Sequence, residues 1–243
     1  DQGAPEGDAS QAPAAREFND ALVWRLESQM GSAPDLVVES EPHDLAAVTQ
    51  DKWFRPTTPT GLTEEKWVKA IEIRPKNAES RRVVHHSLAF LVQQEDGKAG
   101  LPEDVDIPFG PSLFMEWAVG KAGQIFRPDT GKLMMPGLQI TWEMHLYASG
   151  VRVPNAQVEL AVWFHDEPPE HCTILSMFDA QGPNSLDIPP GEIAVTQGNF
   201  VLSAPARLEN FQPHMHMRGK AMSMEATYPN GNREVLAFVD NFQ

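Results

Sequence analysis

The chain has 243 residues, and its 19 Lys and Arg against 34 Asp and Glu give a formal net charge of −15. This length suffices for one or two domains with a buried core, whereas the negative charge disfavours binding to nucleic acids. No stretch of the sequence approaches about 18 consecutive apolar residues, so no membrane-spanning helix is predicted. The single cysteine, Cys172, excludes an intrachain disulfide, a cysteine-rich zinc module and an iron–sulfur cluster.

The N-terminal segment predicts a linker followed by one short helix. Residues 1–15 are rich in Ala, Pro, Gly and acidic residues, a composition typical of linkers. Apolar residues then recur at i, i+4 spacing from Phe18 to Met30, which predicts an amphipathic helix over residues 16–30 that ends before the next glycine. The opening at Asp1 lacks the basic and apolar regions of a signal peptide, so we expect such a peptide to be absent or already removed.

Alternation of apolar and polar residues predicts β-strands from Leu36 onward. The clearest strand is 138–147, in which every second side chain is apolar. Segments 66–74, 83–92 and 158–164 are also strand-like, and turn-forming Pro, Gly and Asn residues separate the strands. No helix of crossover length alternates with them, which argues against a parallel α/β sheet. The sequence therefore predicts an all-β protein built from antiparallel β-sandwiches.

The polar segment HDEPPEH, at residues 165–171, is the best candidate for a domain boundary. We therefore predict a linker and short helix over 1–34, a first β-sandwich over 35–167 and a second over 168–243.

Five of the eight histidines fall in three places that could bind a metal. His214 and His216 flank one residue, and side chains two apart on a strand share a face, so both imidazoles can reach one ion. Two solvated surface histidines remain the alternative.

His85 and His86 are sequence neighbours, which point to opposite faces of a regular strand. They can reach one metal only at a bulge, a twist or a strand end, and the alternative is one core-facing and one exposed histidine. His145 lies on the polar face of the strand 138–147, so it is not a core histidine. Three imidazoles suit copper or zinc, and the absence of thiolates disfavours a structural zinc site.

The remaining candidates have simpler expected roles. We expect His43, His165 and His171 to be solvated. Cys172 is expected to be a small buried residue. A role as a nucleophile is not expected, because the negative charge of Glu170 raises the pKa of the thiol rather than activating it.

Taken together and in this order, the histidine motifs resemble those of the copper type II, ascorbate-dependent monooxygenases, a family that includes peptidylglycine α-hydroxylating monooxygenase and dopamine β-monooxygenase. The similar segments are PTGLTEEKWVKAIEIRP, VVHHSLAFLV, PDTGKLMMPGLQITWEMHLYASG, IPPGE and QPHMHMRGK. The similarity runs from about Ala33 to the last residue, and the lack of the many disulfides of the animal enzymes favours the bacterial branch.

The resemblance implies two jelly-roll-like β-sandwich domains with an open cleft between them and one copper in each. The first copper passes an electron, and its ligands would be His85, His86 and His145. The second binds oxygen and faces the substrate, and two of its ligands would be His214 and His216. The family's third ligand at this site is a methionine well downstream.

Two positions depart from the family pattern. No methionine follows Met224, so we expect either that the chain is a fragment or that the second copper site is incomplete. The peptide-amidating members carry an arginine two residues before the H-x-H motif, where this chain has Gln212. A neutral amide cannot form a charge-assisted pair with a substrate carboxylate, so peptide amidation is not expected.

The resemblance thus implies an enzyme that hydroxylates an activated C–H bond of a small-molecule or peptide substrate, using dioxygen, copper and ascorbate or another reductant. The alternatives are a non-catalytic copper-binding or structural subunit of a periplasmic or membrane-associated assembly, and a zinc protein that uses the first three histidines. Under either copper hypothesis, the enzyme or the non-catalytic subunit, we expect a periplasmic or secreted protein.

Overall fold

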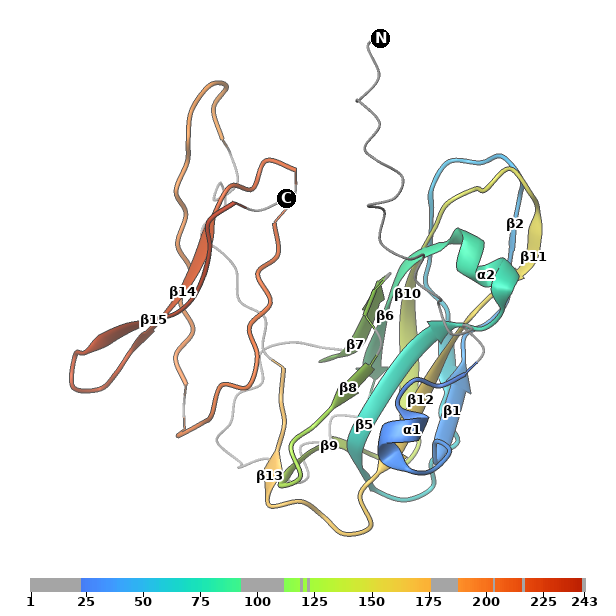
Figure 1. Ribbon diagram of the computed structural model, residues 1–243, viewed down its shortest axis with the longest axis horizontal. Helices are drawn as coiled ribbons and strands as arrows, with labels where there is room; N and C mark the ends of the chain where they lie inside the picture. The colour runs from blue at the N-terminus through green and yellow to red at the C-terminus, as the bar shows by residue number, and fades with distance from the viewer. Residues whose placement is uncertain are drawn as a thin grey trace, which may run out of the picture. The chain divides into compact units, whose positions relative to one another are not determined.

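The computed structural model describes two compact units, Asp1–Phe178 and Asp179–Gln243, each treated by itself below (Figure 1). The residues described are 23–92, 112–118, 120–121, 123–175, 188–202, 204–215 and 217–241. Strands account for most of their regular structure and pair almost entirely in antiparallel fashion, so the protein is all-β, as predicted. No helix in these residues is long and apolar enough to cross a membrane.

The first unit contains two larger sheets and one small two-stranded sheet. The first sheet has the order β1 (Leu36–Glu39), β12 (Val158–Phe164), β5 (Lys66–Pro75), β9 (Thr130–Met134) and β13 (His171–Cys172), with β8 (Gly123–Ile125) also paired to β5. The second sheet has the order β3 (Lys52–Phe54), β10 (Gln139–Leu146), β6 (Val84–Val92) and β7 (Ser112–Ala118), with β4 (Thr57–Pro59) also paired to β10. The small sheet pairs β2 (His43–Leu45) with β11 (Val153–Ala156).

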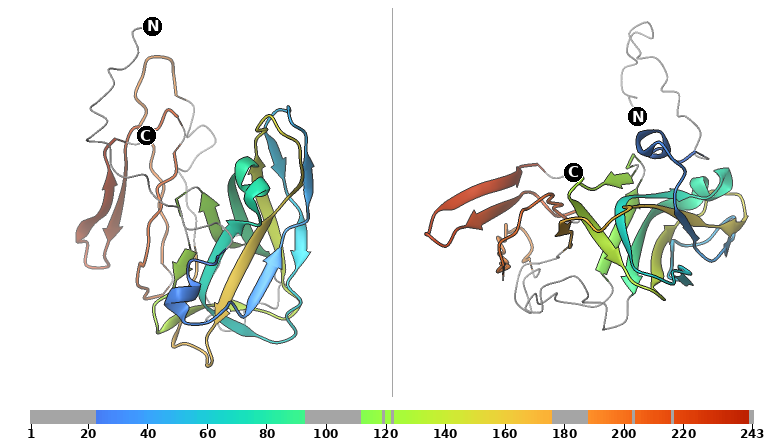
Figure 2. Two further views of the ribbon diagram at one scale, coloured as in Figure 1. Left: turned by 45° about the vertical axis from the view of Figure 1, so that its right-hand side comes forward. Right: turned by 90° about the horizontal axis from the view of Figure 1, so that it is seen from below.

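The two larger sheets enclose one hydrophobic core and so form a β-sandwich, seen as two layers in Figure 2. Strand β10 shows how the sequence dictates this packing. Its inward residues are buried, while Thr141, Glu143 and His145 on the other face are half-buried. The inward residues of β10 are Ile140, Trp142, Met144 and Leu146. The strand predicted over 138–147 is therefore confirmed together with the face that it buries.

The N-terminal helix is shorter than the prediction over 16–30. Helix α1 spans Glu27–Met30 and ends at Gly31, whose left-handed φ of 72° suits a glycine C-cap. Residues 23–26 are not helical, because the buried carboxylate of Glu72 accepts the backbone N–H groups of Arg25 and Leu26 at 3.1 and 2.9 Å. The rest of the predicted helix and the predicted linker lie outside the described residues.

This N-terminal segment also covers the outer face of strand β12. Trp24 and Leu26 pack with Ala161 and Trp163, so β12 is buried on both faces instead of presenting a polar one. The alternation predicted for 158–164 is thus present in the sequence, but it does not mark a solvated face.

A short helix that the sequence analysis missed connects the two sheets. Helix α2 spans Ala78–Val83 and follows β5 in the first sheet directly into β6 in the second. Asn77 caps it, since its side-chain oxygen accepts the N–H of Ser80 at 2.7 Å. The helix therefore fixes where β6 begins, at Val84, directly before the histidine pair.

The second unit has less regular structure. Its described residues contain one antiparallel hairpin, β14 (Met222–Thr227) and β15 (Arg233–Val239), and no second sheet that would make a sandwich. The division between the units falls after Phe178, later than the predicted boundary after residue 167. The reason is that β13 pairs with β9 and holds His171 and Cys172 in the first unit.

Candidate metal centre

The two strands that carry the first three histidines are neighbours in the second sheet. His145 of β10 lies directly opposite His86 of β6, but the next pair is Leu146 with Val84. His85 is therefore an extra residue on β6, and the register shift is a β-bulge. The irregularity that the sequence analysis required at 85 and 86 is present, and it lets two successive side chains serve one side of the sheet.

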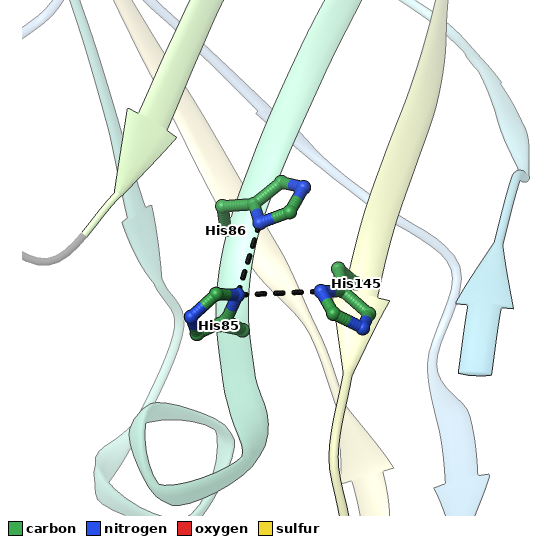
Figure 3. Close-up of side chains that lie close together, drawn as sticks. All are labelled: His85, His86 and His145. Atoms are coloured by element: carbon green, nitrogen blue, oxygen red, sulfur yellow. Dashed lines mark hydrogen bonds between the residues drawn. The ribbon is translucent and has the colours of Figure 1, made fainter. Parts of the chain in front are cut away.

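Figure 3 shows the three imidazole rings turned toward one another. The Nδ1 atom of His85 lies 3.1 Å from Nδ1 of His86 and 3.2 Å from Nδ1 of His145. One ligand atom from each of the three residues lies within 4.8 Å of the others. The predicted convergence of His85, His86 and His145 is confirmed as geometry.

These distances fit a single metal ion. Two imidazole nitrogens about 2.05 Å from an ion and 3.1–3.2 Å apart subtend about 100° at that ion, between square and tetrahedral geometry. His85 is exposed, whereas His86 and His145 are half-buried. The described residues add no fourth His, Cys, Asp or Glu ligand to this group, so a bound ion would keep a position open to solvent or another ligand.

The short strand β3 supplies two further groups to His145. Asp51, just before β3, places Oδ2 3.1 Å from Nε2 of His145. Trp53 of β3 lies opposite His145 in the sheet, and its ring stacks on the imidazole with 4.5 Å between centroids and 4° between planes. The ring of His145 is thus held by its far nitrogen and by one face.

Burial and neighbouring charges shape the electrostatics of the cluster. Partial burial lowers the pKa of His86, and the nearby His145 and His85 lower it further, against the opposing charges of Glu143 and Glu116. A lowered pKa keeps the imidazole neutral, which is the form that binds metals.

The other histidines of the first unit do not join the cluster. The ring of His43 lies against that of Phe54, with 4.5 Å between centroids and a tilt of 34°. His171 is exposed, with 3.7 Å between Nε2 and the Glu170 carboxylate. The expectation of a solvated His165 is wrong, because its Nε2 donates to the Thr130 carbonyl at 2.9 Å and its ring packs near Gly131. His165 therefore has a structural role between β9 and the end of β12.

The second predicted metal site is only partly described. His214 is exposed and lies outside any strand, since the first strand of its unit begins at Met222. The prediction that the H-x-H motif occupies a regular strand is therefore wrong at His214. His216 lies outside the described residues.

Cys172 is half-buried, close to the small buried residue that was expected. Burial raises the pKa of its thiol, which outweighs the opposing charge of Lys132. The cause is desolvation rather than the charge of Glu170, but the conclusion that the thiol is not activated stands.

The sequence analysis missed Asp51 and Trp53. They precede His145 by more than 90 residues, and a three-residue strand gives almost no periodic signal. Only the pairing of β3 with β10 reveals that they share a site.

Comparison of the chain with protein-family models, curated proteins and solved structures found no match.

Proposed function

We propose that His85, His86 and His145 form a mononuclear copper centre, and that the protein is a copper-dependent monooxygenase that hydroxylates an activated C–H bond. The observation that carries the proposal is the convergence of three Nδ1 atoms on a β-bulge, at the spacing of ligands to one ion. A bulge that brings successive histidines to one side has an evident use in metal binding. The resemblance of the histidine motifs supplies the reaction class.

In this proposal the chain's own residues bind and orient, and the metal carries the redox chemistry. Bound copper would supply storage and transfer of single electrons. The three neutral imidazoles would hold it with borderline ligands that support Cu(II). The rigid pairing of β6 with β10 would keep the ligand spacing nearly constant between oxidation states.

The second copper, the dioxygen chemistry and the reductant belong to the same proposal. His214 and His216 are the proposed ligands of the second copper, in the second unit. Ascorbate or another reductant is the proposed electron donor. A periplasmic or extracellular location, a bacterial source and a small-molecule or peptide substrate are proposed with it.

Zinc and a non-catalytic copper role are the competing proposals. Three histidines with an open fourth position also suit catalytic zinc. The exposed, non-strand position of His214 favours a copper-binding subunit that lacks a working oxygen site.

Metal analysis of the protein isolated from its native source, combined with electron paramagnetic resonance, separates these proposals. We expect copper at one equivalent or more per chain, a Cu(II) signal with nitrogen hyperfine structure, and loss of one equivalent in His85→Ala. His171→Ala is the matched control, because this exposed histidine lies outside the cluster. Zinc with no copper would overturn the proposal, and copper without oxygen-dependent hydroxylation by the reduced protein would favour the non-catalytic role.

A further inference from the structure

We propose that Asp51 is a positioning residue of the metal centre, which fixes the ring state of His145 and sets the charge around the ion. This inference rests on the proposed metal-binding function and deepens it. It begins with the 3.1 Å contact between Asp51 Oδ2 and Nε2 of His145.

The contact determines which nitrogen of His145 carries the proton. An ionised carboxylate only accepts hydrogen bonds, so Nε2 must be the donor. In a neutral imidazole the other nitrogen, Nδ1, is then left with its lone pair. Nδ1 is the atom that lies 3.2 Å from Nδ1 of His85, so the carboxylate presents the correct atom to the ion.

The position of the ring is fixed by the same short strand. Trp53 stacks on one face of the imidazole, and Asp51 holds its outer edge. The side chain of His145 is only 16% exposed, whereas that of Asp51 is 64% exposed. A change at Asp51 should therefore alter the metal centre with little effect on the core.

Asp51 differs from the other carboxylates near the cluster in having no cationic side chain that neutralises its charge within the described residues. Glu143 pairs with Arg55 at 2.7 Å, and Glu116 pairs with Lys121 at 3.2 Å. Within the described residues Asp51 accepts a hydrogen bond from Nε2 of His145 at 3.1 Å, and no Lys or Arg pairs with it. Since Cu(II) carries one more positive charge than Cu(I), an uncompensated carboxylate next to a ligand stabilises Cu(II) and lowers the reduction potential.

Three variants test this inference. Asp51→Ala removes the hydrogen bond and the charge, Asp51→Asn removes the charge but keeps an acceptor oxygen, and Glu64→Gln removes an exposed carboxylate paired with Lys66 next to the other sheet. We expect Cu(II) affinity, measured by chelator competition, to fall about 10–100-fold in Asp51→Ala and by less in Asp51→Asn. The potential should rise in both Asp51 variants and stay unchanged in Glu64→Gln.

Nuclear magnetic resonance of the metal-free protein keeps the inference testable if no copper binds. We expect the Nε2–H tautomer of His145 in the wild type and a mixture of tautomers in Asp51→Ala. An Asp51→Ala protein with wild-type tautomer, affinity and potential would overturn the role of Asp51 while leaving the copper proposal intact. A wild type that binds no copper but shows the tautomer change would overturn the copper proposal alone.

Discussion

The two units place their histidines on very different supports. In the first, the ligand strands β6 and β10 pair along almost their whole length and bury their inward faces in a core shared by two sheets. In the second, none of the described residues is buried, and His214 precedes the only described hairpin. The candidate ligands of the first unit thus lie on a packed scaffold, whereas His214 lies on an exposed segment.

The difference teaches what a three-histidine centre requires of its backbone. Ligand atoms must be held within a few tenths of an ångström, and only packed neighbours prevent a strand from relaxing. His85 can occupy a bulge because Val84 and Ser87 on either side of the histidine pair remain buried. We therefore expect first-unit changes to alter stability or metal affinity strongly, and changes at His214 to leave the scaffold intact.

Breaking the scaffold should give the largest effect. Trp142 is fully buried on β10, and its Nε1 donates to Thr58 at 3.2 Å, so Trp142→Ala should lower the free energy of unfolding by about 3–5 kcal/mol. In the second unit Phe238 is 63% exposed, and Phe238→Ala should change stability by no more than about 0.5 kcal/mol. Urea unfolding followed by circular dichroism measures both. A large loss in Phe238→Ala would mean that the hairpin is packed against something.

Removing one ligand should affect metal binding without breaking the scaffold. His86→Ala should weaken copper binding to the first unit more than 100-fold, a loss of about 3 kcal/mol, because the two remaining imidazoles no longer enclose the ion. Chelator competition measures this affinity. His43→Ala is the control, since His43 contacts Phe54 and not the cluster. Equal affinity in His86→Ala and wild type would show that the cluster is not the copper site.

Acid should destabilise the first unit through His86. Burial, with help from His145 and His85, lowers the pKa of His86 below its ordinary 6.5. Between pH 6.5, where the unfolded histidine titrates, and the lower pKa of the folded protein, the unfolded chain binds more protons than the folded one. Stability therefore falls as the pH drops below about 6.5. Urea unfolding of the metal-free protein between about pH 7.5 and pH 5 should show this slope. His86→Gln should reduce it, and an unchanged slope would contradict the assignment to His86.

Much of the first unit could be predicted from the sequence. The alternation in 138–147 predicts both the strand and its buried face, because one face of the strand packs on the core and the other does not. The adjacency of His85 and His86 implies an irregular backbone only if both bind one ion, and the bulge found there meets that condition. Patterning fails where contacts are non-local, since the cover that Trp24 places on β12 joins segments far apart in the chain.

The short helix α2 was missed for a different reason. Six residues are too few for a helical period, and Asn77 is a residue type that is equally typical of a turn. A capping residue and a turn residue have the same local chemistry, so only the following backbone distinguishes them. At the second site, the H-x-H spacing could suggest shared chemistry but could not ensure a strand, because its unit buries none of the residues described.

The smallest effect on stability is expected at His214, and this variant sharpens the comparison most directly. The side chain is exposed, so His214→Ala should shift the free energy of unfolding by no more than about 0.5 kcal/mol and leave copper at the first unit unchanged. If the second unit contributes an oxygen site, the same variant should abolish hydroxylation. Urea unfolding, copper affinity and product formation measure the three expectations on one protein. Unfolding of the second unit in His214→Ala would instead assign the histidine a structural role.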